Sequence, residues 1–500
     1  MKISKILVAN RGEIAVRVMR TCREMGIRTV AVYSDADRQA LHVAMADQAY
    51  RLGGNTPSES YLRQDLIVEI ARHAGVDAIH PGYGFLSENP AFSDLVSSHG
   101  IVFIGPTAES IRSLGDKTAA RSVADKLGIA TVAGTKAPIE DEKVALSVAQ
   151  QIGFPILFKA AAGGGGKGMR IVRSEKEFSS ALRTAKSEAK NAFGDDRIYI
   201  EQYIESPRHV EIQILADHHG NTVYLGEREC SIQRRHQKVI EESPSPIVDE
   251  VMRAQIGEAA VRIVQCAGYT NAGTIEFLVD KKKNFYFLEV NTRLQVEHPV
   301  TESLTGLDLV REQIRIASGE TLGYKQSDIQ RRGHAIECRV CAEDPADNFF
   351  PSIGRLVRYN PPQGPRVRVD NGLRTSDSVT IHYDPLMSKV ITWGNTRTEA
   401  IECMKRALKE FTIEGVNSTI PFCQFVLNHP EFCDGDFDTT FVERKFKPEM
   451  LRSVMAEEEL AVTVASVLLN EFRSAQSKNG SKTATSEESS WKKQRINNHR

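Results

Sequence analysis

The sequence predicts an α/β protein with an N-terminal doubly wound parallel sheet, a second domain with a glycine-rich flap, and a smaller mixed α+β domain. Three observations predict this order. Short apolar strands alternate with helical segments over the first third of the chain, a run of glycines separates two strands in the middle, and short strands with Pro and Gly return later. The 500 residues allow about three domains of ordinary size.

The limits of the domains follow from these changes of pattern. We expect domains at 1–115, 116–333 and 334–446, with the flap of the second domain over about 132–203 and an extension over 447–500. The extension combines an apolar helical stripe with a Ser-, Lys- and Asn-rich end. A helix that packs on this chain or a partner, followed by a disordered tail, is therefore expected there.

The first domain begins with an apolar strand over 5–9 and a helix over 12–25, in which apolar residues recur at helical spacing. The other expected elements are strands at 29–33, 77–80 and 101–104 and a helix at 61–73. Because helices separate the strands, the strands should be parallel and ligands should gather at their carboxyl ends. Asn10–Gly12 and the loop His80–Pro90 are candidate rim residues, although the first segment could equally just begin a helix.

Composition excludes several classes of protein. The 64 Lys and Arg against 65 Asp and Glu leave a net charge of −1, which argues against a dedicated nucleic-acid binder. No apolar stretch approaches the roughly 18 residues of a membrane span, and the N-terminus lacks the apolar core of a secretory signal. Eight scattered cysteines are typical of a reducing compartment. We expect a cytoplasmic enzyme.

A run of glycines lies between two expected strands, Phe154–Lys159 and Met169–Val172. It contains a G-x-G-x-x-G pattern, but a dinucleotide-binding loop should open a helix rather than a strand. It is not a Walker loop either, because Gly168 rather than Ser or Thr follows Lys167. The pattern predicts a mobile flap whose N–H groups close on phosphates, with Lys159 as a phosphate partner. A flexible surface loop is the alternative.

A hairpin with a four-residue loop, 281–284, is expected further along the chain. Asp280 would then face Phe285, and counting along both strands places Glu276 opposite Glu289. Two carboxylates with Cβ atoms about 5 Å apart are normally destabilising. A hard divalent cation relieves that repulsion, and oxygen ligands beside phosphates suit Mg²⁺.

The second strand of this hairpin is predicted to carry further polar groups on the same face. Asn291 lies two residues after Glu289 and is a third candidate oxygen ligand. If the extended run continues, this face also carries Arg293, Gln295 and Glu297. The opposite face is apolar, with Leu288, Val290, Leu294 and Val296. We therefore expect an active-site wall with metal ligands, a guanidinium, an amide and a possible general base.

Two other patterns are less specific. The segment Glu227–Glu242 is dense in Gln, Arg, His and Lys, which would suit an anionic substrate, but a solvated charged surface is equally open. Cys338 and Cys341 have a C-x-x-C spacing, yet an odd offset along a strand places the two thiols on opposite faces. Neither a redox pair nor a zinc site is expected from them.

The sequence contains five long motifs: Ala9–Ala15, His80–Phe85, Lys159–Met169, Cys230–Lys238 and Phe287–His298. They resemble biotin carboxylase, a family of the ATP-grasp superfamily. The resemblance runs from about residue 5 to 446, and its motifs are more specific than those shared by all ATP-grasp enzymes. It implies an N-terminal biotin carboxylase domain, an ATP-grasp domain and a C-terminal biotin carboxylase domain.

The resemblance implies ATP-dependent carboxylation of biotin by bicarbonate through carboxyphosphate. The residues that match ATP-binding positions are Lys117, Lys159, Gly165, Gly166, Glu201, Gln202, Tyr203, Ile204, His209, Gln233, His236, Glu276 and Glu289. Those that match ligands of Mg²⁺ or Mn²⁺ are Glu276, Glu289 and Asn291. Those that match the bicarbonate and biotin site are Lys238, Arg293, Gln295, Val296 and Arg339.

Four of the matched residues are expected to be catalytic: Arg293, Glu297, Arg339 and Lys238. By resemblance, Glu297 is the general base that deprotonates bicarbonate. Arg339 matches the residue that stabilises the biotin enolate, a task that suits a permanent cation beside a developing oxyanion.

A biotin carrier domain would need an exposed lysine in an Ala-Met-Lys-Met-like hairpin. The nearest string, Cys403–Arg406, falls inside an expected helix over Thr398–Phe411. We therefore expect a separate subunit that acts on biotin attached to a carrier protein, together with carboxyltransferase subunits, and that forms a homodimer. The final acceptor is left open between acetyl-CoA, another acyl-CoA, pyruvate and 2-oxoglutarate.

Two rival functions remain at this point. Another ATP-grasp ligase would share the flap and the paired glutamates, but it need not carry Arg339 or the motif Asn291–Glu297. A non-catalytic scaffold subunit of a carboxylase should have lost at least one key residue. All six are present: Lys238, Glu276, Glu289, Arg293, Glu297 and Arg339.

Overall fold

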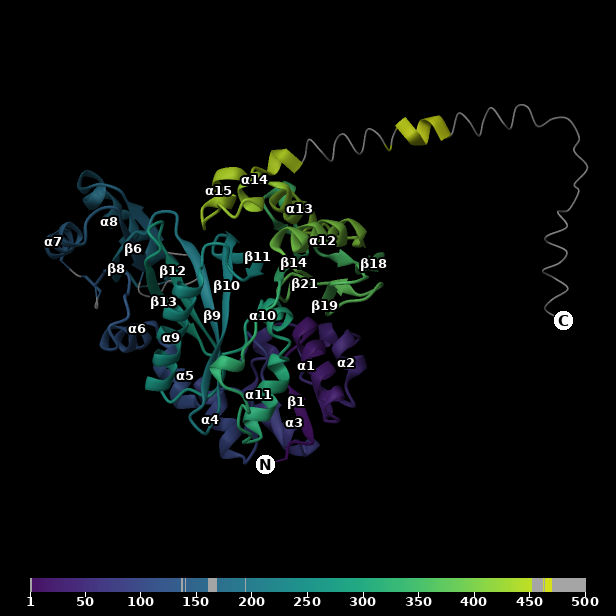
Figure 1. Cartoon of the computed structure of the whole chain (residues 1–500). Helices are drawn as coiled ribbons and strands as arrows, with labels where there is room; N and C mark the ends of the chain where they lie inside the picture. The colour runs from purple at the N-terminus through teal and green to yellow at the C-terminus, as the bar shows by residue number, and fades with distance from the viewer. Residues whose placement is uncertain are drawn as a thin grey trace, which may run out of the picture. The chain divides into compact units, whose positions relative to one another are not determined.

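The computed structural model describes residues 2–135, 138–139, 141–160, 169–193, 195–451, 462 and 464–469. The chain divides into two units, Met1–Phe446 and Lys447–Arg500. Figure 1 traces the order of the helices and strands from the N-terminus to the C-terminus.

The N-terminal sheet is parallel and doubly wound, as the sequence predicts. Its strand order is β3-β2-β1-β4-β5, and every pair is parallel. The strands are β1 (Lys5–Val8), β2 (Arg28–Tyr33), β3 (Gln48–Arg51), β4 (Ala78–His80) and β5 (Val102–Phe103). The helices of this region are α1 (Gly12–Glu24), α2 (Leu41–Met45), α3 (Gln64–Ala74), α4 (Pro90–Ser98) and α5 (Ala108–Gly115). The strand β3, which is mostly exposed, was missing from the sequence-based prediction.

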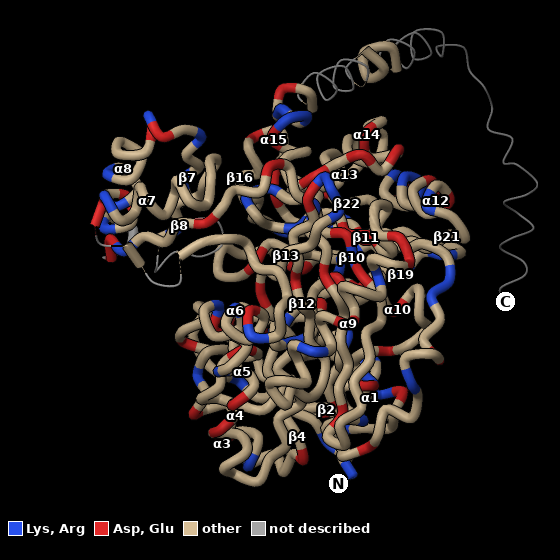
Figure 2. Tube along the Cα trace, turned by 60° about the vertical axis from the view of Figure 1, so that its left-hand side comes forward, with Lys and Arg blue, Asp and Glu red and all other residues tan. Residues whose placement is uncertain are grey.

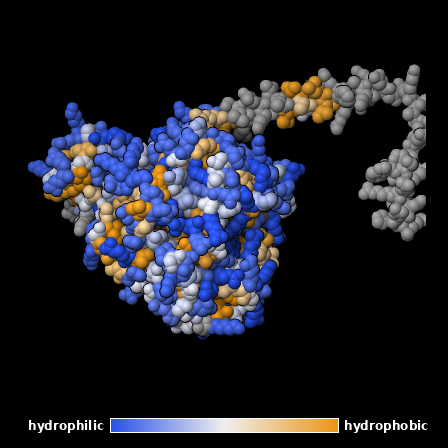
Figure 3. All heavy atoms as spheres, in the orientation of Figure 1, coloured by the Kyte–Doolittle hydropathy of each residue, from blue (hydrophilic) through white to orange (hydrophobic). Residues whose placement is uncertain are grey.

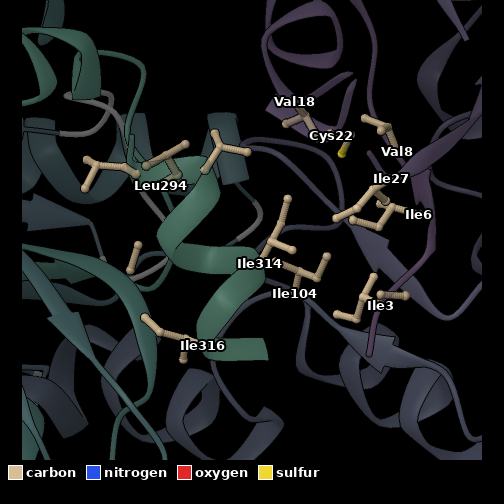
Figure 4. Packing of buried hydrophobic residues seen from close by; sticks show 14 of the residues in the cluster. Ile3, Ile6, Val8, Val18, Cys22, Ile27, Ile104, Leu294, Ile314 and Ile316 are labelled. Atoms are coloured by element: carbon tan, nitrogen blue, oxygen red, sulfur yellow. The ribbon is translucent and has the colours of Figure 1, made fainter. Parts of the chain in front are cut away.

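Apolar side chains bury both faces of this sheet, which is why β1 reads as a continuous apolar run. Ile6 and Val8 pack with residues of α1 and of α11 (Leu309–Ala317), and Figure 4 shows this cluster around Val18, Cys22 and Ile314. Leu7 of the same strand and Ala9, the residue after its end, face the opposite way, toward residues of α3 and α4. Alternation along β1 thus assigns successive side chains to two different cores.

The second sheet has eight strands in the order β13-β12-β9-β10-β11-β14-β21-β19, and its pairs are antiparallel. The strands are β9 (Arg208–Ala216), β10 (Thr222–Arg234), β11 (Gln237–Ser243), β12 (Asn271–Val279), β13 (Phe285–Asn291), β14 (His334–Cys341), β19 (Val367–Asn371) and β21 (Leu386–Gly394). It continues across the domain limit expected after residue 333, because β11 pairs with β14. Figure 2 shows acidic and basic residues along β10 and β11 in the middle of the molecule.

Helices cover this sheet or join its strands. They are α6 (Lys117–Lys126), α9 (Glu250–Cys266), α10 (His298–Thr305) and α11. Apolar residues of α9 pack on β9 and β12, and they form a core with Ile212, Ile275 and Phe277. Polar side chains on the other face of β9 are equally buried, so this sheet has one apolar face and one buried charged face.

A three-stranded antiparallel sheet, in the order β7-β6-β8, carries the expected flap strands. Its strands are β6 (Ile156–Ala160), β7 (Met169–Val172) and β8 (Ile198–Gln202), and its helices are α7 (Glu142–Ile152) and α8 (Glu175–Phe193). The pairing of β6 with β7 confirms the predicted hairpin, with Lys159 opposite Met169. The glycines between them, including Gly165 and Gly166, lie outside the described residues.

The C-terminal part of the first unit adds short strands and helices. They are β15 (Glu343–Asp344), β16 (Phe350–Pro351), β17 (Gly354–Arg355), β18 (Arg358–Asn360), β20 (Ser378–Val379), β22 (Thr412–Glu414), α12 (Arg397–Glu410), α13 (Ile420–Asn428), α14 (Pro430–Cys433) and α15 (Phe441–Lys445). The helix α12 lies within one residue of the expected limits. Lys405 is therefore a helical residue and does not stand in a hairpin turn.

The second unit is described only in part. Residues 464–469 are helical, as expected, and Val464, Val467 and Leu468 of the predicted apolar stripe are exposed. Figure 3 shows these hydrophobic residues together, whereas hydrophobic residues on the visible face of the first unit are scattered. The expected tail after residue 473 lies outside the described residues. Within the described ranges, we find no helix with the length and apolar character needed to cross a membrane.

Candidate active site on the charged face of the large sheet

The hairpin of β12 and β13 places two carboxylates opposite each other. Glu276 pairs with Glu289, as the sequence predicts, but the register near the loop differs from the prediction. Val279, and not Asp280, lies opposite Phe285, and the register then shifts by one residue before Glu276. The extra residue forms a β-bulge in β13, which restores the predicted alignment of the two glutamates.

Glu276 is buried and surrounded by hydrogen-bond donors. Its Oε2 lies 2.9 Å from His209 Nε2, and its Oε1 lies 2.9 Å from both Lys238 Nζ and Asn291 Nδ2. Burial would raise the pKa of Glu276, but the charges of Lys238 and His209 outweigh it and hold that pKa well below the ordinary value. Glu289 is more exposed, and Lys117 Nζ at 2.8 Å is its ion-pair partner.

Lys238 is the common cation of three buried carboxylates. Its Nζ lies 2.6 Å from Glu211, 2.9 Å from Glu276 and 2.8 Å from Glu297. Burial would lower the pKa of Lys238, but the three carboxylates raise it well above the ordinary value, so the ammonium stays charged. Gln233 lies opposite Lys238 in the hairpin of β10 and β11.

Glu297 stands between two cations. Its Oε1 accepts from Lys238, and its Oε2 accepts from Arg339 Nη2 at 2.9 Å. Burial would raise the pKa of Glu297, but Lys238 and Arg339, together with Arg228, lower it well below the ordinary value. Glu297 is therefore an ionised proton acceptor whose position is fixed on two sides.

The predicted alternation along one strand does not extend to Glu297. The strand β13 ends at Asn291, the next residues are irregular, and Glu297 is the N-cap residue of α10, which has Pro299 in its first turn. Residues 293–296 therefore do not alternate between the two faces of a strand. Leu288 and Val296, which were expected on an apolar face, are only half-buried. The side chains still meet, because the turn brings Gln295 Nε2 to 3.4 Å from Glu276 Oε1.

Arg293 is held by the loop that the sequence predicted as a rim of the site. Its Nε donates to Glu88 Oε2 at 2.8 Å, and its other nitrogens reach Asn291 Oδ1 at 3.2 Å and Gln295 Oε1 at 3.0 Å. The other predicted rim segment, Asn10–Gly12, contacts the same loop: the Nδ2 of Asn10 donates to Pro81 O at 2.7 Å. The first and second sheets thus meet at the carboxyl ends of β1 and β4.

Arg339 lies on β14, one strand away from Lys238. Besides Glu297 it binds Glu241, whose Oε1 lies 2.6 Å from Arg339 Nε. Cys338 and Cys341 on the same strand are buried free thiols. Because β11 pairs with β14, Lys238 and Arg339 both bind the carboxylate of Glu297, although they are 101 positions apart in sequence.

The candidate ATP residues fall into two groups. Lys159 on β6 forms an ion pair with Glu201 on β8, whose other oxygen lies 3.2 Å from Arg121 Nη1. The segment from Glu201 to Ile204 is half-buried, and its Tyr203 N–H donates to Pro155 O at 3.0 Å. The other group lies on or beside the large sheet: Lys117, His209, Gln233, His236, Glu276 and Glu289.

Sequence reasoning missed four charged residues at the site: Glu88, Glu211, Arg228 and Glu241. The residues His209, Glu211 and Gln213 alternate along β9, and this polar alternation inside an otherwise apolar strand could have identified one of them. Glu88 lies within the predicted rim loop. Arg228 and Glu241 gave no signal of their own, because the segment around them reads equally well as a charged surface.

Models of known protein families match three successive parts of the chain. A model of the biotin carboxylase N-terminal domain matches residues 2–111, and a model of the biotin carboxylase C-terminal domain matches residues 337–444. Between them, residues 116–325 match the ATP-binding domain of the carbamoyl-phosphate synthase L chain. Biotin carboxylase 1 of Bacillus subtilis is 52% identical over 88% of this chain and 98% of its own length.

The chain belongs to the biotin carboxylase family.

Other relatives agree with this assignment. A pyruvate carboxylase subunit of Methanothermobacter thermautotrophicus is 50% identical over 93% of this chain and 95% of its own length. A solved biotin carboxylase domain dimer of the Hydrogenobacter thermophilus 2-oxoglutarate carboxylase, in complex with MgADP, ADP and bicarbonate, is 46% identical. The match covers 89% of this chain and 98% of the chain of the solved structure, with a TM-score of 0.84.

Membership of the biotin carboxylase family separates this chain from other ATP-grasp ligases. The central domain alone would fit several of them, as the carbamoyl-phosphate synthase match indicates. The flanking biotin carboxylase domains decide the assignment, since the C-terminal one carries Arg339. The chain is accordingly a ligase of the biotin carboxylase type, which carboxylates biotin with ATP and bicarbonate.

The arrangement around Lys238 makes a prediction about stability. In Lys238→Gln, three buried carboxylates lose their common cation, and we expect the free energy of unfolding to fall by about 3–5 kcal/mol at neutral pH. Urea unfolding followed by circular dichroism measures this. Lys283→Gln is the matched control, since its ion pair with Asp249 is exposed, and it should cost less than about 1 kcal/mol. Equal stability of the two variants would contradict the central role of Lys238.

Proposed function

We propose that this chain catalyses the first half-reaction of a biotin-dependent carboxylase and acts on biotin attached to a separate carrier protein. One observation supports this assignment of roles: the ionised carboxylate of Glu297 is held between Lys238 and Arg339, beside the facing pair Glu276 and Glu289. A base, two permanent cations and paired oxygen ligands within one buried face suit an anionic substrate and a transferring phosphate.

Bicarbonate would bind where Lys238, Arg293, Gln295 and Val296 meet. Glu297 then accepts the O–H proton of bicarbonate, the freed oxygen attacks the γ-phosphorus of ATP, and ADP leaves as carboxyphosphate forms. An anion bound there competes with Glu297 for the same cations, which raises the pKa of this carboxyl and its power as a base. The chain's own residues thereby couple substrate binding to proton transfer.

Arg339 would act in the second step. Carboxyphosphate breaks down to CO₂ and phosphate beside biotin, the released phosphate accepts the N1 proton, and negative charge rests on the ureido oxygen until N1 forms its bond to CO₂. The guanidinium of Arg339 remains charged, since Glu241 and Glu297 raise its pKa despite burial. A permanent cation at that oxygen stabilises the enolate-like form of biotin.

ATP and a divalent cation are the proposed cofactors, with biotin as a carrier-bound substrate. The oxygen ligands Glu276, Glu289 and Asn291 lie on facing strands and suit Mg²⁺, with Mn²⁺ as a second possibility. The cation would neutralise charge on the phosphates when bound. Lys117, Lys159, His209, Gln233, His236 and the segment Glu201–Ile204 would hold the nucleotide, with Gly165 and Gly166 over its phosphates.

The proposed partners are a biotin carrier protein, carboxyltransferase subunits and a second copy of this chain. The solved relative named above is a dimer of biotin carboxylase domains. The final acceptor stays open between acetyl-CoA, another acyl-CoA, pyruvate and 2-oxoglutarate. A cytoplasmic location is proposed because the eight cysteines are all free thiols.

ADP release by the purified chain tests the activity directly. With Mg·ATP, we expect turnover that requires bicarbonate and that free biotin or a biotinylated carrier stimulates. The control omits bicarbonate. Turnover that is indifferent to both bicarbonate and carrier would contradict the proposal, and absence of all turnover would favour a scaffold subunit.

The facing carboxylates predict altered metal dependence for Glu289→Gln. Loss of one oxygen charge should raise the Mg²⁺ concentration needed for half-maximal ATP hydrolysis by about tenfold, equivalent to about 1.4 kcal/mol. A Mg²⁺ titration at saturating ATP measures this. Glu410→Gln, on the exposed surface of α12, is the control. An unchanged Mg²⁺ requirement would remove Glu289 from the proposed ligands.

The position of Arg339 predicts a separation of two activities. Arg339→Ser should reduce biotin carboxylation by about 100-fold or more while part of the bicarbonate-dependent ATP hydrolysis survives. Carboxybiotin and ADP are measured in parallel. Arg397→Ser is the matched control, because Arg397 is also a mostly buried arginine paired with a glutamate of β11, Glu242, at 2.7 Å. Equal loss of both activities in Arg339→Ser would indicate a structural role.

A further inference from the structure

A fully buried lysine that none of the proposed substrate contacts uses lies beside the active site. Lys389 on β21 has an exposed side-chain fraction of 0%. Its Nζ donates to the carbonyl oxygen of Val296 at 2.8 Å. Val296 directly precedes Glu297, so this carbonyl belongs to the peptide group that joins the proposed bicarbonate residue to the proposed base.

Buried acidic side chains surround Lys389: Glu13 and Asp370 lie closest, and its charge also acts on Glu337 of β14. Its Nζ lies 3.6 Å from Glu13 Oε2 and 3.8 Å from Asp370 Oδ2. Asp370 also pairs with Arg368, at 2.7 Å. Since Asp370 pairs with Lys389 across the strands β19 and β21, the register of the sheet fixes the position of the ammonium.

Close packing of α1 against β19 brings Glu13 to this lysine. A Cβ atom on Gly372, the residue after the end of β19, would lie 2.5 Å from the backbone nitrogen of Glu13, so only glycine allows this approach. Glu13 also accepts a hydrogen bond from the hydroxyl of Tyr83 in the predicted rim loop. The ring of Tyr83 has its centroid 5.7 Å from Lys389 Nζ. Lys389 therefore links the rim loop, α1 and the segment that carries Glu297.

The segment that Lys389 contacts has little regular structure of its own. Residues 292–295 belong to no helix or strand, and Glu297 is the N-cap of α10 without a side-chain cap. Its backbone contacts are longer ones, such as His298 N to Gln295 O and Val300 N to Glu297 O, both at 3.3 Å. Two shorter bonds restrain this turn, the one from Lys389 Nζ to Val296 O and the one between His298 Nδ1 and Gln295 O, both at 2.8 Å, and only the first is charge-assisted and comes from outside the turn.

A role in stability alone does not account for Lys389. Replacing a buried ion pair by an apolar side chain of similar volume is often neutral or stabilising. Apolar side chains in place of Lys389 and its acidic partners would fill the same space without the cost of desolvating these charges. What an apolar side chain cannot supply is the donor to the Val296 carbonyl.

We propose that Lys389 is a positioning residue of the carboxylation reaction, which fixes the Val296–Glu297 peptide and so aims the Glu297 carboxylate at bicarbonate. This inference deepens the proposed function and rests on it. Lys389 touches neither substrate nor nucleotide. It acts through the backbone carbonyl of Val296, whereas Lys238 contacts the side chain of Glu297.

Steady-state kinetics of two variants test the proposal. Lys389→Met removes the donor and the charge. Lys389→Met with Glu13→Gln also removes one acidic partner, while Asp370 keeps its ion pair with Arg368. In both we expect kcat/KM for bicarbonate in ATP hydrolysis to fall by about 10- to 100-fold, with KM for Mg·ATP within about twofold of the original. Both variants also remove the lysine charge that acts on the buried Glu337, so they share this change. Lys389→Arg keeps a charged donor and should restore part of the loss.

Arg253→Met is the matched control. Arg253 is also buried, pairs with Glu227 at 2.6 Å and donates to a backbone carbonyl, Val248 O, at 3.1 Å, but it lies away from the turn of Glu297. This variant should lose stability without a change in kcat/KM for bicarbonate. A folded double variant with the original bicarbonate dependence, or an equal kinetic loss in Arg253→Met, would overturn the role of Lys389.

Amide hydrogen exchange separates this inference from the proposed function. Protection of residues 292–300 should fall in Lys389→Met and remain unchanged in Arg253→Met, whether or not the chain turns over. If the original chain lacks bicarbonate-dependent turnover, the proposed function fails. If exchange in residues 292–300 is the same in Lys389→Met as in the original chain, the positioning role fails.

Discussion

The charge balance around Lys238 is the interaction on which the active site depends. Glu211, Glu276 and Glu297 lie within 2.9 Å of one ammonium, on a sheet face that is closed to solvent. Three carboxylates in such a place repel one another strongly, and burial adds the cost of desolvation. The ammonium of Lys238 lowers the pKa of Glu276 and, with Arg339, that of Glu297, so both stay ionised, whereas burial raises the pKa of Glu211.

Continuity of the large sheet brings these groups together. His209 and Glu211 come from β9, Glu276 from β12, Lys238 from β11 and Arg339 from β14. Because neighbouring strands lie about 4.8 Å apart, side chains on one face of these four strands can converge on one substrate. The limit expected between the second and third domains therefore falls within the active site, where β11 pairs with β14.

The same face extends beyond the residues that touch substrates. Lys389 on β21 balances Glu13 and Asp370 while it restrains the turn that carries Glu297. Two lysines thus contact this turn, Lys238 at the side chain of Glu297 and Lys389 at the backbone carbonyl of Val296. A base that is held by its side chain and by its backbone keeps its geometry when bicarbonate displaces part of its ion pairs.

The sequence by itself determined the parallel first sheet, the flap hairpin and the opposition of Glu276 and Glu289. These features follow from local periodicity and from counting across one turn, and long motifs added the family. Tertiary structure alone decided the rest. The bulge that realigns β13 within its hairpin and the end of that strand at Asn291 were not predictable by counting. The contact of Arg339 with Glu241 and Glu297, and that of Lys389 with the Val296 carbonyl, depend on pairing between distant strands. Contacts over such separations leave no periodic signal in sequence, because each residue type at these positions also fits an exposed strand.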